Sequence, residues 1–275
     1  MRHRAAWLLS LAVALAFLSP LLWMLSASLR QSSLVFRTDW QALSDVSGVF
    51  QNYTAAWRRA SLGHAFLISS TQVAIIGALG LFVNSLAAFA FARLEFRARE
   101  WLFAAVVALV ILPVEVLAVP LLLTARSFGL TGGYLATLGG LTLPFVAKAF
   151  NIYFLRQHFL LLPRELEEAG ALDGAGVWAQ FWAIALPSVR PALATVVLLD
   201  VLTHWSDFLW PLLLATRNET QTVQIGLANL FTQPPLDWGA IMAYAVLATL
   251  PVVVSFRLFQ RSLMATQGDR SGSAP

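Results

Sequence analysis

Five ionisable side chains stand inside segments that otherwise consist of apolar residues: Glu115, Lys148, Asp200, His204 and Asp207. An ionised group at the centre of a membrane helix costs about 2.5–3.5 kcal/mol, so such residues usually serve a function or partner one another. Asp200, His204 and Asp207 follow i, i+4 and i+7 spacing, which predicts that they share one face of a helix. We expect that face to point into the interior of a helix bundle.

Two roles stay open for these five residues and for Asn84, a polar residue in an earlier apolar segment. They either line a pathway for a polar solute or fix the packing of helices through satisfied polar contacts. An ion pair between Lys148 and Asp200 is one arrangement that would lower the cost of both charges.

Enzymatic and metal chemistry fit these residues poorly. An aspartic protease needs two carboxylates about 3 Å apart, whereas seven residues of helix separate Asp200 and Asp207 by about 10 Å of rise. The histidines lack metal-ligand spacing and the chain has no cysteine, so no catalytic or metal-binding residue is predicted. A proton relay through Asp200, His204 and Lys148, as in an ion-coupled secondary transporter, is the main alternative, although no inverted repeat supports it.

The segments that carry these residues are long enough to cross a membrane. Of the 275 residues, 59% are hydrophobic and only 12% are charged, which indicates a membrane protein. A bilayer core about 30 Å thick needs about 20 apolar residues per helix. We therefore predict an all-α, polytopic membrane helix bundle with six transmembrane helices, at Ala5–Leu25, Phe66–Ala92, Trp101–Thr124, Tyr134–Leu155, Ala192–Leu214 and Trp238–Phe259.

The basic residues predict how the bundle is oriented. With the N-terminus inside, the inner segments carry eleven arginines and the outer segments six. Basic residues collect on the cytoplasmic side, so we expect both termini and the loop between the fourth and fifth spans to be cytoplasmic. The net charge of +4 then reflects an anionic membrane surface, and nucleic acid is not an expected partner.

The N-terminal apolar run could be a signal peptide, because Arg2 and Arg4 precede it and small residues at 26–28 resemble a cleavage site. Its length of about 21 residues exceeds the 7 to 15 of a signal peptide and favours a retained helix. The following segment, Ser28 to Ala65, is predicted to be extracytoplasmic and to hold short helices.

The loop between the fourth and fifth spans, 156–190, has a helical pattern of its own. Pro163 suits the first position of a helix, and Glu165, Glu167 and Glu168 fall where negative charge favours the helix dipole. This helix is predicted to reach about Leu172 and to end in a left-handed turn at Gly174.

A second short helix is predicted over about Val177–Ala185, ended by Pro187. It carries Val177, Trp178, Phe181 and Trp182 on one face. The first helix, with only small side chains at 169–171, would form a compact knob that this aromatic face holds on the bundle. A surface loop that merely connects two spans is the alternative.

The same loop resembles a known signature. Glu168-Ala169-Gly170, three residues, Gly174, nine residues, Ile184, one residue and Leu186-Pro187 are similar to the EAA loop of bacterial ABC importer permeases, Glu-Ala-Ala-X3-Gly-X9-Ile-X-Leu-Pro. Gly170 replaces the usual second alanine; it lowers helix propensity by about 1 kcal/mol but keeps the position small. In that family the loop forms a coupling helix that docks on the ATPase. The resemblance implies an ATPase-coupling role for Glu168, Ala169, Gly170, Asp173, Gly174, Ile184, Leu186 and Pro187.

Further stretches resemble the carbohydrate-importing, MalG-like branch of these permeases and cover most of the chain. They are 84–94, 155–157, 162–166, 172–175 and 205–211, the last with Trp205-Ser206-Asp207 where the branch usually has Trp-Asn-Asp. The resemblance implies a membrane-spanning permease subunit that translocates a sugar, or a related polyol or glycerol phosphate. A permease for another solute class is the alternative within the family.

The resemblance also implies the partners. These are a second homologous permease subunit, a dimer of cytoplasmic ABC ATPases, an extracytoplasmic solute-binding protein and the lipid bilayer of the bacterial cytoplasmic membrane. Lys148, the only lysine, follows no glycine-rich phosphate loop. ATP and Mg are therefore expected on the partner ATPase, with no cofactor bound by this chain.

The sequence thus divides into three predicted parts. Residues 1–64 hold the first transmembrane helix and the extracytoplasmic segment. Residues 65–262 form the permease core, with the EAA loop at 156–190. Residues 263–275, small and polar at their end, are predicted to be a disordered cytoplasmic tail.

Overall fold

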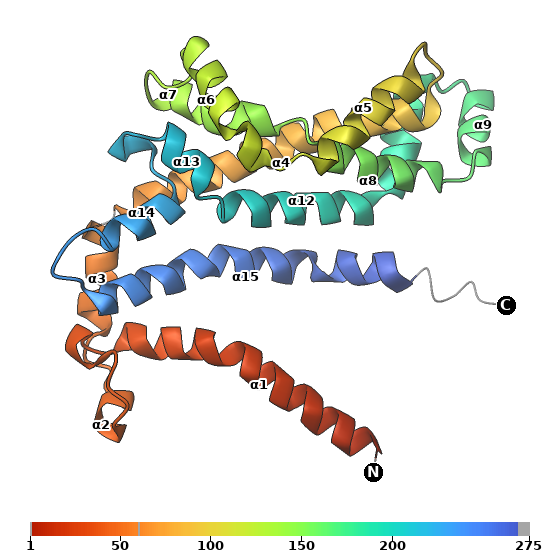
Figure 1. Cartoon of the computed structure of the whole chain (residues 1–275). Helices are drawn as coiled ribbons and strands as arrows, with labels where there is room; N and C mark the ends of the chain where they lie inside the picture. The colour runs from red at the N-terminus through yellow and green to blue at the C-terminus, as the bar shows by residue number, and fades with distance from the viewer. Residues whose placement is uncertain (1, 60, 269–275) are drawn as a thin grey trace. The chain divides into compact units, whose positions relative to one another are not determined.

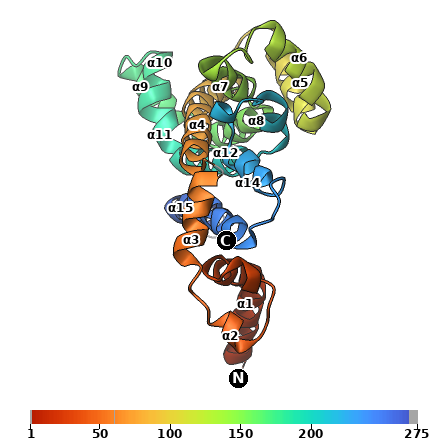
Figure 2. The same ribbon diagram turned by 90° about the vertical axis from the view of Figure 1, so that its left-hand side faces the viewer.

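The computed structural model describes residues 2–59 and 61–268, and within these ranges the regular secondary structure is entirely helical. The chain divides into two compact units (Figures 1 and 2). Unit 1 is Met1–Phe66 with Thr222–Pro251, and unit 2 is Leu67–Gln221 with Val252–Pro275. The all-α prediction is confirmed. The division at residues 64 and 262 stays a prediction.

Unit 1 contains α1 and the short helices that follow it. Its elements are α1 (Arg2–Leu29), η1 (Ser32–Leu34), α2 (Trp40–Leu43), α3 (Val49–Arg59), α14 (Val223–Leu230) and the first part of α15 (Trp238–Gly268). The buried Asn52 amide of α3 donates to the carbonyls of Ser28 and Arg30, at 2.8 and 2.6 Å, which satisfies the end of α1. Short helices after the first span were predicted, and the structure has them.

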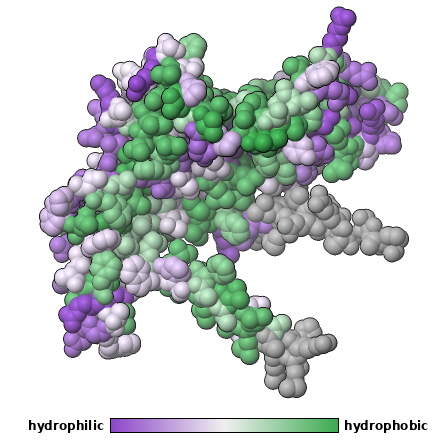
Figure 3. Space-filling view, viewed as in Figure 1, coloured by the Kyte–Doolittle hydropathy of each residue, from purple (hydrophilic) through white to green (hydrophobic). Residues whose placement is uncertain are grey.

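Unit 2 holds every candidate functional residue. Beyond the continuation of α4 (Leu62–Arg93), its helices are α5 (Arg99–Ile111), η2 (Val114–Leu117), α6 (Ala118–Ser127), α7 (Tyr134–Thr142), η3 (Leu143–Phe145), α8 (Ala149–Leu160), α9 (Glu165–Leu172), α10 (Val177–Ala179), η4 (Gln180–Ala185), α11 (Leu186–Ser188), α12 (Arg190–Trp205), α13 (Leu209–Leu214) and η5 (Asn218–Thr220). On the visible face of this unit, apolar residues cover the middle and hydrophilic residues gather near α9 (Figure 3).

Among the residues that the structure describes, three helices are long and apolar enough to cross a membrane unaided: Ala6–Leu29, Leu62–Arg93 and Trp238–Gln260. Three further spans are reached only if bent pairs of helices count as one each. The pairs are Arg99–Ile111 with Val114–Ser127 (96°), Tyr134–Phe145 with Ala149–Leu160 (46°), and Val177–Ser188 with Arg190–Trp205 (77°). Several long apolar helices are therefore present, and a count of six spans stays a prediction.

The predicted spans Trp101–Thr124 and Tyr134–Leu155 are each broken by a bend in the structure. The first breaks at Leu112, whose ψ of 120° is extended because Pro113 follows and disfavours helical backbone before it. The second breaks at Lys148, which is also extended, at φ −116° and ψ 119°. At this second break, Asn84 of α4 hydrogen-bonds the backbone of Val146 and Lys148.

The predicted fifth span, Ala192–Leu214, is also two helices. α12 ends at Trp205, and the carboxylate of Asp207 accepts the backbone N–H of Trp210 at 3.4 Å, so it supports the start of α13 instead of continuing α12. At the other end of the chain, α15 continues to Gly268. Residues 263–268 of the predicted tail are helical, as their lack of proline and their mostly good helix formers favour; residues 269–275 lie outside the described residues.

The core of unit 2 packs around aromatic rings of α4, α8 and the 177–188 helix. Phe89 lies 5.7 Å from Phe159 and 5.2 Å from Phe181, measured between ring centroids, and all three rings are buried. Buried aromatic rings dominate the packing energy of such a core. This cluster fixes the helices that carry the candidate site.

Candidate functional site

The helix α9, Glu165–Leu172, begins in a run of acidic residues. Glu165, Glu167 and Glu168 occupy its first turn, where carboxylates stabilise the positive end of the helix dipole. Pro163 lies just outside the helix and not at its first position as predicted, because Arg164 is the residue that caps it. The carbonyl of Arg164 accepts the N–H groups of Glu167 and Glu168, both at 3.0 Å.

The C-terminus of α9 forms the predicted glycine turn. Gly174 has a φ of +81°, a conformation that strains any residue with a Cβ atom. The N–H of Ala175 donates to Gly170 O at 2.8 Å, and that of Gly174 donates to Ala171 O at 3.0 Å. This pair of bonds is a Schellman motif, which satisfies the last carbonyls and turns the chain sharply.

The outward face of α9 is small-sided and open. Glu168, Ala169 and Asp173 are exposed, and Leu172 is 89% exposed. On the inward face, a Cβ added to Gly170 would lie 2.6 Å from Ile184 Cδ1. The glycine therefore lets the backbone of α9 approach Ile184 of the next helix more closely than the usual alanine would.

The helix that follows runs over Val177–Ser188 and contains a π-helical segment, Gln180–Ala185. Pro187 was predicted to end this helix, but it lies within the last turn, α11. The predicted aromatic face is split: Phe181 is buried, whereas Val177, Trp178 and Trp182 are 51%, 60% and 44% exposed. Phe181 and Ala185 pack this helix into the core, and Trp182 stacks on Phe82 of α4 with 6.2 Å between ring centroids.

A buried ion pair joins α9 to α4. Arg93 Nε lies 2.8 Å from Glu167 Oε1, with only 6% and 17% of the two side chains exposed. Arg93 Nη2 also donates to Leu162 O at 2.6 Å, just before α9. This pair was not predicted from the sequence. There, Arg93 is one of the eleven inner arginines and Glu167 is one of three carboxylates that suit a helix start.

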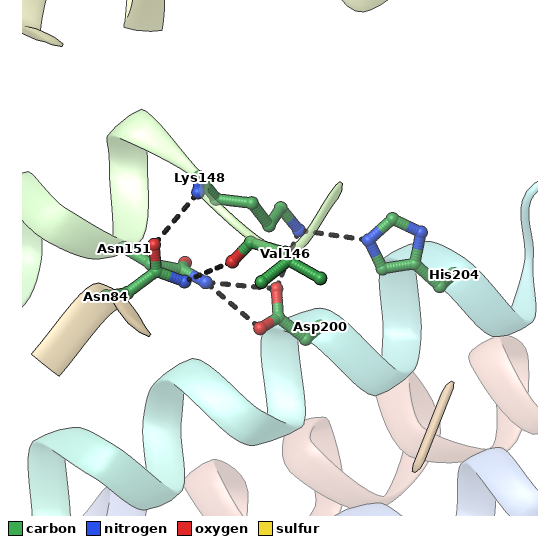
Figure 4. A network of polar contacts seen from close by, with 6 residues as sticks. All are labelled: Asn84, Val146, Lys148, Asn151, Asp200 and His204. Carbon is green, nitrogen blue, oxygen red and sulfur yellow. Dashed lines mark hydrogen bonds and ion pairs between the residues drawn. The ribbon is translucent and has the colours of Figure 1, made fainter. Parts of the chain in front are cut away.

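The polar residues of the predicted spans meet at the break between η3 and α8 (Figure 4). Lys148 Nζ lies 2.6 Å from Asp200 Oδ1 and 3.3 Å from His204 Nε2. Asn151 Nδ2 donates to both oxygens of Asp200, at 3.2 and 3.0 Å. The side chain of Asp200 is 1% exposed, so its charge is neutralised almost without water.

Asn84 of α4 closes the break itself. Its Nδ2 donates to Val146 O at 3.0 Å, and its Oδ1 accepts the N–H of Lys148 at 2.9 Å. One buried side chain thus replaces the two backbone hydrogen bonds that the extended Lys148 removes from the helix. Gly80, one turn earlier, permits this approach, since a Cβ there would lie 3.2 Å from Val146 O.

The predicted common face of Asp200, His204 and Asp207 is only partly confirmed. Asp200 and His204 lie together on α12 and both contact Lys148, but Asp207 lies beyond the end of α12. Asp207 instead lines a cavity of about 390 Å³ with Glu115, Lys148, His204, Phe145, Ser206 and Trp210, and with apolar residues of η2 and α6. Packing and cavity-lining residues are thus adjacent, and Lys148 and His204 belong to both groups.

Asn151 contacts Asp200 in this network, but it was not among the polar residues predicted from the sequence to form it. It stands three residues after Lys148 in an apolar segment, so helical spacing would have placed both on one side of α8. The prediction of a Lys148–Asp200 ion pair is confirmed. Glu115 and Asp207 lie away from that pair because the helices break before each of them, and these breaks were not predicted.

The chain is similar to known proteins along most of its length. Residues 78–265 match the family described as "binding-protein-dependent transport system inner membrane component". The arabinooligosaccharides transport system permease protein AraQ of Halalkalibacterium halodurans is 32% identical, over 94% of each chain. The diacetylchitobiose uptake system permease protein NgcG of Streptomyces coelicolor is 33% identical, over 89% of this chain and 80% of its own.

A solved structure shares the fold. A chain of a bacterial ABC transporter involved in the import of the acidic polysaccharide alginate superposes with a TM-score of 0.80, over 95% of this chain and 96% of its own, at 21% identity. The family match covers both the α9 turn and the Lys148–Asp200 network. The chain therefore belongs to the family of binding-protein-dependent inner-membrane permease components of ABC importers.

Proposed function

We propose that this permease carries an oligosaccharide or a related sugar, as a member of the MalG-like branch. The names of the two relatives above, both similar to this chain over most of its length, refer to oligosaccharide uptake. The solute is delivered by an extracytoplasmic binding protein, and a second permease subunit completes the membrane pathway. Both termini and α9 lie on the cytoplasmic side, as the distribution of arginines indicates.

The observation that carries the mechanism is the geometry of α9. Its outward face is exposed and small-sided, while its inward face is fixed by the Gly174 turn and the Arg93–Glu167 pair. Such a helix can enter a groove of an ATPase with Glu168 as a polar contact and can pass a displacement to the bundle. ATP hydrolysis belongs to the partner, and no catalytic residue is assigned to this chain.

Transport then follows from a two-state equilibrium. Closure of the ATPase dimer displaces α9, and the helices of unit 2 change from an inward-facing to an outward-facing arrangement. ATP can bias this equilibrium only through contacts that differ between the two states. The contacts of Glu168, Ala169 and Asp173 with the ATPase are the ones proposed to differ.

The cavity beside Lys148 is the proposed contribution of this chain to the solute pathway. A volume of about 390 Å³ falls within the range of small-molecule sites. Glu115 and Asp207 present carboxylates that can accept hydrogen bonds from sugar hydroxyls, and Phe145 offers an aromatic ring. Asn84 and Asp200, both fully buried, are assigned to helix packing.

Reconstitution tests this proposal. The chain, its companion permease and its ATPase are placed in proteoliposomes with the binding protein, and uptake of labelled arabinotriose and diacetylchitobiose is measured. We expect uptake of a sugar that requires ATP and that is insensitive to an uncoupler. Uptake that persists with a hydrolysis-deficient ATPase and collapses with the uncoupler would instead support ion coupling through Lys148 and Asp200.

A further inference from the structure

Arg93 holds the start of the coupling segment in two ways at once. Its Nη2 donates to Leu162 O at 2.6 Å and its Nε lies 2.8 Å from Glu167 Oε1. The guanidinium is planar and keeps its charge, so one side chain contacts both the segment before α9 and a carboxylate of its first turn. A displacement of α9 therefore cannot leave Arg93 in place without breaking a buried contact.

Burial distinguishes this pair from the other arginine pair at the same end of unit 2. Arg99 and Glu100 are adjacent in sequence, and their side chains are 32% and 67% exposed. Water and salt screen such a pair, and its loss changes little. Arg93 and Glu167 lie 74 positions apart and are 6% and 17% exposed, so they join two separate elements where water is largely excluded.

The helix that carries Arg93 also carries a residue of the polar network. Asn84 stands nine residues earlier on α4, about 14 Å along the helix axis. It bonds both Val146 O and the N–H of Lys148, at the break beside the cavity. α4 is continuous between these two positions, so a movement received at Arg93 reaches the break through one rigid element.

We propose that Arg93 is a positioning residue that transmits displacement of α9 through α4 to the Val146–Lys148 break. This inference rests on the proposed function, since it needs an ATPase that moves α9. It assigns to the Arg93–Glu167 pair a role in transport that a mere folding contact would not have. Asn84 is the residue through which the movement reaches the cavity.

The test uses the natural absence of cysteine from this chain. Ser206→Cys places one thiol in the cavity, and Ala169→Cys places one on the exposed face of α9. In the complete complex in proteoliposomes, the labelling rate of the Ser206→Cys thiol by a membrane-impermeant maleimide is measured with and without ATP, Mg and vanadate. Crosslinking of the Ala169→Cys thiol to the ATPase is measured in parallel.

In the complex with Arg93 we expect nucleotide to change the labelling rate about tenfold, within the usual range of coupling between sites. Arg93→Gln should reduce the change to less than about twofold while the Ala169→Cys crosslink persists. Glu167→Gln should act in the same direction, and the double variant should be no worse than Arg93→Gln alone because both remove one interaction. Arg99→Gln is the matched control and should keep the full response.

Three results would overturn the inference. One is a full nucleotide response in Arg93→Gln. Another is a full nucleotide-dependent change in labelling rate in Glu167→Gln, together with loss of the Ala169→Cys crosslink in Arg93→Gln. Arg93 would then serve folding alone. A third is additive loss in the double variant. A different result would overturn the proposed function itself. In complexes that keep Arg93 and Glu167, nucleotide would not change the labelling rate of the Ser206→Cys thiol, and the Ala169→Cys thiol would not crosslink to the ATPase.

Discussion

The α9 turn and the Lys148–Asp200 network both place charged residues in an apolar chain, but they do so in opposite surroundings. Glu168 and Asp173 stand exposed around a small-sided helix, whereas Asp200 is 1% exposed and contacts both Lys148 and Asn151. The first region keeps its polar groups available to another protein. The second uses its polar groups to satisfy one another.

Because of these surroundings, substitutions in the two regions should affect different properties, stability in one and coupling in the other. Loss of a charge from an exposed helix leaves no unsatisfied group behind, so its effect appears only when the partner is present. Loss of a charge from a buried network leaves its partner uncompensated within the chain. Stability should therefore respond in the network, and coupling should respond at α9.

The largest effect is expected from Asp200→Ala. It removes the acceptor of Lys148 and Asn151 and should lower the free energy of unfolding by about 3–5 kcal/mol. Thermal unfolding of the purified chain in detergent measures this. The double variant Lys148→Met with Asp200→Leu removes both charges and should recover much of the loss; equal destabilisation in the double variant would contradict an ion-pair role.

Gly174→Val should have the next largest effect, and it should act on coupling. A β-branched residue at φ +81° stores about 1–3 kcal/mol of backbone strain and displaces the end of α9. We expect the number of solutes carried per ATP to fall at least about tenfold while the chain still inserts into the membrane. Gly176→Val is the control, because its φ of −67° and ψ of 167° suit valine. Normal uptake by the Gly174→Val variant would remove the turn from the mechanism.

Glu115→Gln tests the cavity without disturbing the network. Glu115 is exposed and lines the cavity, so stability should not change. A lost charged hydrogen bond of about 1.5–3 kcal/mol should raise the solute concentration needed for half-maximal uptake about tenfold or more. Glu95→Gln, at an exposed site outside the cavity, provides the comparison; identical transport by both variants would place the pathway elsewhere.

Gly170→Ala should have the smallest effect. The new Cβ would meet Ile184 Cδ1 at 2.6 Å, which is the movable tip of a side chain, and the better helix propensity of alanine opposes the clash by about 1 kcal/mol. The free energy of unfolding should change by less than about 1 kcal/mol. Adding Ile184→Val should relieve the clash, and a double variant less stable than Gly170→Ala would show that the contact itself stabilises α9.

The same contrast explains what could be predicted from the sequence. The α9 turn depends on residues within ten positions of one another, so local rules for acidic helix starts and left-handed glycine were sufficient. The break at Lys148 depends on Asn84, 64 positions earlier, satisfying backbone groups that only the folded chain brings near. The Arg93–Glu167 pair joins residues 74 positions apart and leaves no local pattern.

The π-helical segment shows a further limit of sequence periodicity. Spacing of i and i+4 predicted one aromatic face for Val177, Trp178, Phe181 and Trp182, but only Phe181 is buried, and the π-helical turn at Gln180–Ala185 shifts the register of the residues that follow it. A change of helical pitch alters every later position by a fixed angle. Periodicity alone could not reveal it.

Nucleotide-dependent crosslinking from α9 tests the central claim most directly. The exposed Ala169→Cys in the otherwise cysteine-free chain should crosslink to the ATPase, with a yield that changes when ATP, Mg and vanadate are added. Ser44→Cys, exposed in the segment predicted to be extracytoplasmic, should give no such product. Absence of an Ala169→Cys crosslink to the ATPase in every nucleotide state of an assembled, transporting complex would contradict the assignment of α9 as the coupling helix.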